Sequence, residues 1–133
     1  MIISIEWLKK DGSQVLKGDK ICRITGQCVS ILAGERSALN FLQVLSSTST
    51  RTREYMNVLK NSGVQNCVIV DTRKTVPGLR LAQKYAVRLG GGTNQRFGLW
   101  DALLVKENHL ITLGGLKKLA NLIRPTDSRE EDI

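Results

Sequence analysis

Residues 67–75, CVIVDTRKT, decide the fold, because an apolar run leads directly into a turn that carries two cations, Arg73 and Lys74. Lys106 likewise follows a second apolar run, ALLV at residues 102–105. Short apolar runs bounded by turn residues are typical of buried parallel strands. The carboxyl ends of such strands meet at one edge of a sheet, where α/β proteins bind ligands. The sequence therefore predicts a site for a small polyanion at that edge.

A helix and a cationic loop are predicted between these two runs. Thr75 is a suitable N-cap and Pro77 suits the first turn, so we expect a helix that reaches residue 87. The glycines at 90–92 end it, and Arg96 follows in the next turn. The glycine run could cradle a phosphate, but a loop that simply ends the helix is the better interpretation.

The region before residue 34 is predicted to be β-rich, because β-branched residues recur at about every second position between turn signals. Over residues 35–45 the apolar spacing becomes helical. The polar run at 46–52 is expected to interrupt this helix. A second helix is expected over residues 50–60, ending near Gly63.

Two βα units cannot form a covered parallel sheet by themselves. Residues 67–71 and 102–106 are the two predicted strands of this region, whereas a closed α/β barrel takes about 250 residues. A last helix is predicted over 113–123 and a polar tail over 124–133. The predicted fold class is therefore α/β with an α+β start, in which residues 63–123 form the first two βα units of an incomplete barrel.

The charge favours an anionic ligand. The chain has 133 residues and a formal charge of +8, from 20 Lys and Arg against 12 Asp and Glu. Nucleic-acid binding usually needs a basic stripe interleaved with aromatic residues. Here the aromatic residues are scattered and cations gather at predicted strand ends, so we expect a substrate that bears phosphate or carboxylate groups and no nucleic acid.

Other classes of protein are disfavoured. The three cysteines have no C-x-x-C spacing, which argues against a metal site, and Cys67 is expected to be a small buried apolar residue. No apolar run reaches the length of about 18 residues that a membrane span needs, and no signal-peptide pattern is evident. We therefore expect a cytoplasmic protein that does not enter a membrane. Residues 11–19 fit the D-G-x-x-V-x-x-G-D pattern of modules with a swinging lysine arm, but no lysine stands where that arm would be.

Several motifs in one order resemble the quinolinate phosphoribosyltransferase family, whose members are also called carboxylating nicotinate-nucleotide pyrophosphorylases. The motifs are G-E-R-x-A-L-N-F-L from residue 34, D-T-R-K-T-x-P-G-L-R from 71, K-Y-A-V-R-x-G-G-G from 84, N-x-R-x-G-L-x-D from 94 and K-x-N-H from 106. A related family of molybdenum-cluster proteins shares the R-K-T core. The P-G-L-R and K-x-N-H elements favour the phosphoribosyltransferase.

The resemblance implies an N-terminal open sandwich, here residues 1–62 with their helices, followed by an α/β barrel over residues 63–123. It also implies a homodimer, or a larger oligomer, whose subunits share active sites. The implied reaction joins quinolinate to phosphoribosyl pyrophosphate and releases pyrophosphate and carbon dioxide, giving nicotinate mononucleotide for NAD biosynthesis. In the family, Mg²⁺ accompanies the phosphoribosyl pyrophosphate. The acidic residues that serve the donor and its metal belong to later strands that this chain does not contain.

The resemblance assigns roles by motif position. Arg36 is implied to reach the quinolinate of the neighbouring subunit, and Arg73 and Arg96 to hold its carboxylates. Lys74 and Lys106 are implied to lie between quinolinate and the phosphoribosyl donor, as the catalytic lysines. Gln95 stands where the family has a histidine, so the substrate-binding set is Arg36, Arg73, Lys74, Gln95, Arg96 and Lys106, with no metal ligand.

Two functions stay open from the sequence. The chain carries the quinolinate half of the phosphoribosyltransferase site, or it is a non-catalytic piece that assembles with a longer homologue. His109, the single histidine, is expected to make a structural hydrogen bond rather than to bind a metal.

Overall fold

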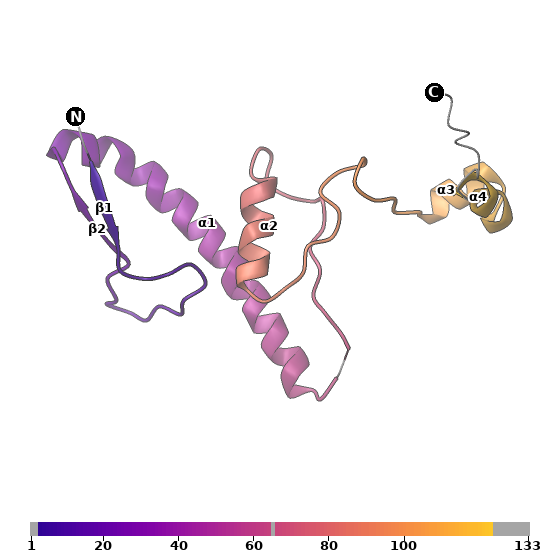
Figure 1. The fold of residues 1–133 in the computed structure, drawn as a ribbon, viewed down its shortest axis with the longest axis horizontal. Helices are drawn as coiled ribbons and strands as arrows, with labels where there is room; N and C mark the ends of the chain where they lie inside the picture. The colour runs from indigo at the N-terminus through magenta and orange to yellow at the C-terminus, as the bar shows by residue number, and fades with distance from the viewer. Residues whose placement is uncertain (1–2, 65, 124–133) are drawn as a thin grey trace, which may run out of the picture. The chain divides into compact units, whose positions relative to one another are not determined.

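The computed structural model describes residues 3–64 and 66–123 of the chain. It forms two compact units, Met1–Gly98 and Leu99–Ile133. The first unit contains two strands and two helices, β1, β2, α1 and α2, and the second contains the helices α3 and α4 (Figure 1). The fold of the described residues is thus mainly helical with one small sheet.

The strands β1 (Ser4–Trp7) and β2 (Cys22–Thr25) pair in an antiparallel sheet, with Ser4 opposite Thr25. A salt bridge of 2.6 Å between Glu6 and Arg23 spans this pair on an exposed face. Both strands fall inside the region predicted to be β-rich. That prediction is wrong for residues 28–33, which already belong to a helix. Gly34 did not break this helix, because it lies in open space where a glycine costs only about 1 kcal/mol relative to alanine.

The helix α1 (Cys28–Asn61) runs without interruption for 34 residues. The predicted break at residues 46–52 is therefore wrong. The hydroxyl groups of Thr48 and Thr52 donate hydrogen bonds to the carbonyl groups of Val44 and Thr48, so these side chains turn back on the helix instead of ending it. The predicted stop is confirmed, since Gly63 adopts a left-handed φ of 70° just beyond the helix.

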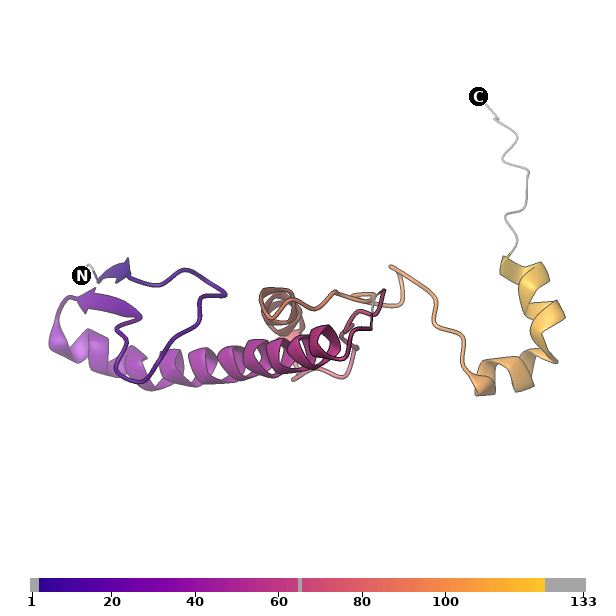
Figure 2. The same cartoon turned by 90° about the horizontal axis from the view of Figure 1, so that it is seen from below.

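The helix α2 (Arg80–Leu89) packs across α1, as two views at right angles show (Figures 1 and 2). The contact is close because glycines face Thr52 of α1. A Cβ atom on Gly90 would lie 2.6 Å from the Ser49 carbonyl oxygen, and one on Gly92 would lie 2.9 Å from the Thr52 methyl group. The glycine run thus ends α2, as predicted, and also lets the two helices meet.

The start of α2 differs from the prediction. Thr75 does not cap the helix, which begins five residues later at Arg80. A turn over residues 76–79 intervenes, closed by a 3.0 Å hydrogen bond from the Leu79 amide to the Val76 carbonyl, and Gly78 takes a φ of 77° in it. Pro77 therefore serves a tight turn rather than a first helical turn.

The predicted strand at residues 67–71 is reduced to one parallel bridge, between Val70 and Thr93. Its hydrogen bonds run from the Thr93 amide to the Ile69 carbonyl, at 2.8 Å, and from the Asp71 amide to the Thr93 carbonyl, at 3.2 Å. A parallel strand needs partners along its length. In the described part of the chain this segment meets only a short stretch, so no strand forms.

The second unit contains α3 (Glu107–Leu113) and α4 (Leu116–Ile123). The predicted strand at 102–106 is absent, since residues 102–105 are irregular. The single helix predicted over 113–123 is also wrong in its first part. Gly114 and Gly115 adopt φ values of 75° and 106°, which end α3 and separate it from α4. The predicted tail at 124–133 lies outside the described residues.

Few side chains are buried. Among the described residues, Ala86 is the buried hydrophobic side chain, at 2% exposure, and Thr52 and Lys84 are the buried polar ones. Cys67 is exposed, so its predicted burial is wrong. Large apolar side chains such as Leu103 are widely exposed. The described fold therefore depends on a small set of specific contacts, and the densest of these lies around Lys84.

Candidate functional site

Two loops that the sequence places far apart lie side by side. The parallel bridge between Val70 and Thr93 sets residues 71–75 next to residues 94–97. The first loop carries Arg73 and Lys74, and the second carries Gln95 and Arg96. Four of the six predicted substrate-binding residues therefore belong to one local cluster, which we call the two-loop cluster.

Asp71 lies at the centre of the two-loop cluster and accepts three hydrogen bonds. Its Oδ2 atom accepts one from the side-chain amide of Asn94, at 2.6 Å. Its Oδ1 atom accepts one from the Gln95 backbone amide, at 2.9 Å, and another from the Lys84 ammonium group. A buried carboxylate needs such partners, since its desolvation is otherwise costly. One side chain of the first loop thus fixes the backbone of the second.

Lys84 is a residue of α2 that contacts both loops. Its side chain is 1% exposed and that of Asp71 is 7% exposed, so they form a buried ion pair. The Lys84 ammonium also donates a hydrogen bond of 2.9 Å to the Gln95 carbonyl oxygen and lies 5.0 Å from the centre of the Phe97 ring. The same charged group therefore contacts both loops at once.

Arg80 supports the loops one turn earlier on α2. Its guanidinium donates a hydrogen bond of 3.0 Å to the Phe97 carbonyl oxygen and a longer one of 3.4 Å to the Arg73 carbonyl oxygen. Residues four apart lie on one helical face. The face formed by Arg80 and Lys84 consequently holds the backbone of each loop.

The predicted binding side chains differ in exposure. Arg73 is half-buried, and its Nε atom is buried with no hydrogen-bond partner among the described residues. Lys74 is exposed, while Gln95 and Arg96 are half-buried. The backbone amide of Lys74 donates a hydrogen bond of 3.1 Å to the Thr72 hydroxyl, which shapes the turn. This local hydrogen bond adds to the support that Asp71, Arg80 and Lys84 give to the two loops.

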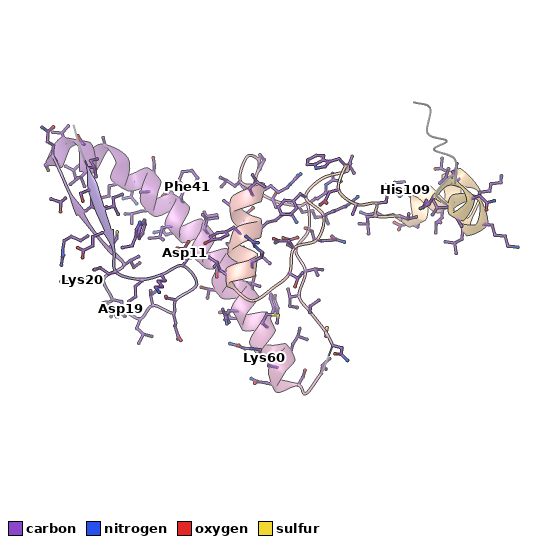
Figure 3. The ribbon with its side chains drawn as sticks, in the orientation of Figure 1. Asp11, Asp19, Lys20, Phe41, Lys60 and His109 are labelled. Atoms are coloured by element: carbon purple, nitrogen blue, oxygen red, sulfur yellow. The ribbon has the colours of Figure 1, made fainter. Side chains whose placement is uncertain are left out.

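Arg36 does not lie in the two-loop cluster. Arg36 lies on α1, 16 positions before the Thr52 contact with α2, which corresponds to about 24 Å along the helix axis. Lys106 belongs to the second unit. Its backbone amide donates a hydrogen bond of 3.0 Å to His109 Nδ1 at the start of α3 (Figure 3), which confirms the hydrogen-bonding role predicted for His109.

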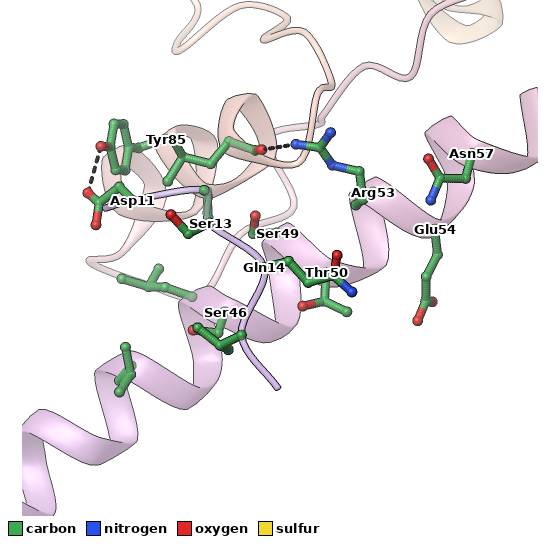
Figure 4. Close-up of a pocket in the computed structure, with 16 residues that line it drawn as sticks. Asp11, Ser13, Gln14, Ser46, Ser49, Thr50, Arg53, Glu54, Asn57 and Tyr85 are labelled. Carbon is green, nitrogen blue, oxygen red and sulfur yellow. Dashed lines mark hydrogen bonds between the residues drawn. The ribbon is translucent and has the colours of Figure 1, made fainter. Parts of the chain in front are cut away.

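A cavity of about 740 Å³ lies elsewhere in the first unit, between the loop that precedes β2 and the helices α1 and α2 (Figure 4). Its walls carry hydroxyl and amide groups such as Ser46, Ser49 and Asn57, and none of the predicted binding residues. The Tyr85 hydroxyl donates a hydrogen bond to Asp11 here, and this bond is the main cause that raises the pKa of Tyr85. Because it lacks the predicted cations, the cavity is not the candidate anion site.

No metal site is evident in residues 3–64 and 66–123, which contain no group of three or more His, Cys, Asp or Glu side chains able to hold an ion. Nor does any helix in this part of the chain combine the length and apolarity needed to cross a membrane.

The residues that support the two-loop cluster were not predicted from the sequence. Arg80, Lys84 and Asn94 all occur in the quoted motifs, but only as letters without a role. A lysine inside an amphipathic helix usually projects into solvent. The available signal was its spacing from Arg80, since residues four positions apart lie on one face of the helix.

Comparison with known proteins gives a consistent result over the whole chain. The sequence model of the "Quinolinate phosphoribosyl transferase, N-terminal domain" matches residues 2–46, and that of the "Quinolinate phosphoribosyl transferase, C-terminal domain" matches residues 48–132.

Individual relatives agree with these matches. A probable carboxylating nicotinate-nucleotide pyrophosphorylase of Bacillus subtilis is 46% identical over 108 residues, covering 81% of this chain and 36% of the relative. A chloroplastic enzyme of the same name from Arabidopsis thaliana is 39% identical over 125 residues, covering 94% of this chain and 34% of its own length. This chain thus spans about a third of the curated relatives that it matches.

Solved structures share the fold. The nicotinate-nucleotide pyrophosphorylase from Francisella tularensis superposes with a TM-score of 0.86 at 45% identity, covering 96% of this chain and 44% of that protein. NadC from Streptococcus pyogenes gives a TM-score of 0.82 at 42% identity, covering 90% and 43%. The likeness therefore extends to nearly the whole chain.

Proposed function

This chain belongs to the quinolinate phosphoribosyltransferase family, and on that premise we propose that its two-loop cluster binds quinolinate for transfer of a phosphoribosyl group. The reaction would join quinolinate to phosphoribosyl pyrophosphate and yield nicotinate mononucleotide, carbon dioxide and pyrophosphate. The observation that carries this proposal is the adjacency of residues 71–75 and 94–97, which sets Arg73 and Arg96 on neighbouring loops.

The chemistry of quinolinate suits this cluster. Two adjacent carboxylates on a pyridine ring form a compact dianion, and guanidinium groups pair with carboxylates through two parallel hydrogen bonds. The Arg73 Nε atom is a buried donor without an acceptor, and a carboxylate drawn to this guanidinium would offset that cost. Loss of carbon dioxide leaves electron density on the ring, which fixed positive charges stabilise.

Each predicted residue keeps a proposed role. Arg73 and Arg96 hold the carboxylates, Lys74 and Lys106 face the developing charge between quinolinate and the donor, and Gln95 offers a neutral amide. Arg36 is proposed to act in the site of a neighbouring subunit. The length of α1 supports this last role, because it separates Arg36 from the two-loop cluster of its own chain.

The finer architecture is also a proposal. We place residues 1–62 in an open-sandwich domain and residues 63–123 in the first two βα units of an α/β barrel, in a cytoplasmic homodimer. The parallel bridge between Val70 and Thr93 supports the first proposed strand, since it shows that the segment at residue 70 can pair in the parallel direction. The likeness to the Francisella tularensis structure supports the same placement.

The described residues do not fit a protein-held Mg²⁺ ion, because they contain no cluster of acidic side chains for it. The proposed role of this chain is accordingly the binding of quinolinate, and Mg²⁺ is proposed only as a companion of phosphoribosyl pyrophosphate. A second function follows from the same observation: the chain could serve as a non-catalytic assembly partner of a longer homologue.

Calorimetry with quinolinate and nicotinate tests the proposal. We expect quinolinate to bind far more tightly than nicotinate, because quinolinate has a second carboxylate that can engage a cation of the second loop. Arg73→Ala should weaken quinolinate binding by about 1.5–3 kcal/mol, the usual range for a hydrogen bond to a charged group. Arg88→Ala, which removes an exposed cation of α2, is the matched control. Equal affinity for the two ligands would contradict the proposal.

A turnover assay separates the two functions. Formation of nicotinate mononucleotide from quinolinate and phosphoribosyl pyrophosphate would show an active enzyme. Binding of quinolinate without turnover would favour the assembly partner.

A further inference from the structure

The two loops of the two-loop cluster do not hold each other by backbone pairing alone. Among the described residues, their backbone pairing is limited to the hydrogen bonds that join Thr93 to Ile69 and to Asp71. Beyond that point, their spacing depends on the Asp71 carboxylate and on the cations of α2. A change in this support would therefore move Arg73 relative to Arg96 without altering either side chain.

Lys84 is a residue of α2 whose side chain contacts both loops. Its ammonium group pairs with Asp71 on the first loop and donates to the Gln95 carbonyl on the second. Its own backbone carbonyl accepts a hydrogen bond of 2.8 Å from the Asn94 side chain. An ammonium group has three donors, and at 1% exposure this one is directed at protein groups rather than at a ligand.

We infer that Lys84 is a positioning residue that sets the separation of the two loops and thereby selects a dicarboxylate over a monocarboxylate. A ligand with one carboxylate needs only one loop, whereas adjacent carboxylates must meet cations at a fixed separation. This inference rests on the proposed function, because it concerns the ligand selectivity of the same cluster.

Lys84→Met tests the inference, since methionine keeps most of the side-chain volume and removes the charge. We expect quinolinate affinity to fall about tenfold to a hundredfold, as for lost positioning of a binding group. Nicotinate affinity should change little, so the selectivity ratio should collapse. Arg88→Met, on the same helix with an exposed side chain, should leave the ratio unchanged.

A second variant distinguishes a loss of stability from a loss of ligand selectivity. Lys84→Met leaves Asp71 buried without its cation, which destabilises the fold. The double variant Asp71→Asn with Lys84→Met removes both charges and should recover thermal stability, measured by circular dichroism. It should not recover selectivity. A double variant with the stability and the selectivity of the unaltered chain would overturn the inference.

Amide hydrogen exchange gives a readout that needs no ligand. The Gln95 amide donates to Asp71, so its exchange reports whether the loops stay joined. In Lys84→Met this amide should exchange at least about tenfold faster, and in Arg88→Met it should not. If the unaltered chain binds neither ligand, the proposed function fails, and unchanged exchange at Gln95 in Lys84→Met would then overturn the positioning role separately.

Discussion

Tyr85 donates a hydrogen bond of 2.8 Å to Asp11, although 74 positions separate the two residues. Tyr85 lies on α2 and Asp11 lies in the loop between β1 and β2. The bond therefore ties the first part of the chain to the helix that carries Lys84. It also places a phenol next to a carboxylate, which raises the pKa of Tyr85 above its ordinary value.

The first prediction concerns this pKa. Asp11→Ala should return the pKa of Tyr85 toward the ordinary tyrosine value of about 10. The ultraviolet absorbance of tyrosinate measures it, with Tyr85→Phe to assign the transition. Asp19→Ala, in the same loop but paired with Lys9, should leave the titration unchanged.

The sign of the accompanying pH dependence follows from linkage. Because the pKa of Tyr85 is higher in the folded state than in the unfolded state, its contribution to stability is complete below about pH 10. That contribution is lost as the pH rises through the folded-state pKa. The free energy of unfolding should therefore fall less steeply above pH 10 in Tyr85→Phe; an identical slope would show that the bond is not formed in solution.

The second prediction compares two glycines. Gly90→Ala should destabilise the first unit by about 1–3 kcal/mol, because the new methyl group would overlap the Ser49 carbonyl and Thr52 at 2.6 Å. Gly34→Ala, inside α1 and with nothing within 4 Å, should stabilise it by up to about 1 kcal/mol. Urea unfolding measures both. Equal effects of the two substitutions would show that α2 does not pack on α1 as described.

The third prediction concerns the departure at Gln95. Gln95→His should strengthen quinolinate binding, and more so at lower pH, because a protonated imidazole adds a positive charge to the two-loop cluster. Calorimetry across the range around pH 6.5 measures this, with the unaltered chain as the control. A substituted protein whose affinity neither rises nor varies with pH would place residue 95 outside the binding site.

The fourth prediction concerns self-association. Large apolar side chains such as Leu103, Leu116 and Trp100 are 74%, 69% and 85% exposed. Exposed apolar surface promotes association, so the isolated chain should be oligomeric, loosely packed or prone to aggregate. It should not form nicotinate mononucleotide, because the described residues contain no acidic cluster for the Mg²⁺ that accompanies phosphoribosyl pyrophosphate. Sedimentation velocity and a turnover assay measure these. A monodisperse monomer with measurable turnover would contradict both parts.

The sequence predicted features that depend on local chemistry. The stop near Gly63 and the end of α2 at the glycine run follow from what glycine allows, and both are confirmed. The predicted strands at 67–71 and 102–106 failed because a parallel strand requires partners that local sequence does not reveal. The predicted break at 46–52 failed because the hydroxyl groups of Thr48 and Thr52 donate to carbonyl groups one turn earlier on the same helix.

The candidate site was also predicted only in part. The motifs placed Arg73 after a predicted strand and Arg96 after the glycine run that ends a predicted helix, and the two loops that carry them are indeed neighbours. What holds those loops together was not predictable from periodicity, because burial of Lys84 depends on a carboxylate 13 positions earlier. The binding roles of Arg73, Lys74, Gln95, Arg96, Arg36 and Lys106 stay predictions.

The uninterrupted α1 connects the two regions of this chain that the family sequence models match. The two family sequence models meet at residue 47, between their matches to 2–46 and 48–132, and residue 47 lies inside α1 (Cys28–Asn61). No loop separates the two regions at this point, because both are part of one continuous helix. A twist or tilt at Cys28 is therefore passed along one continuous helix toward Thr52, which contacts Gly90 at the end of α2.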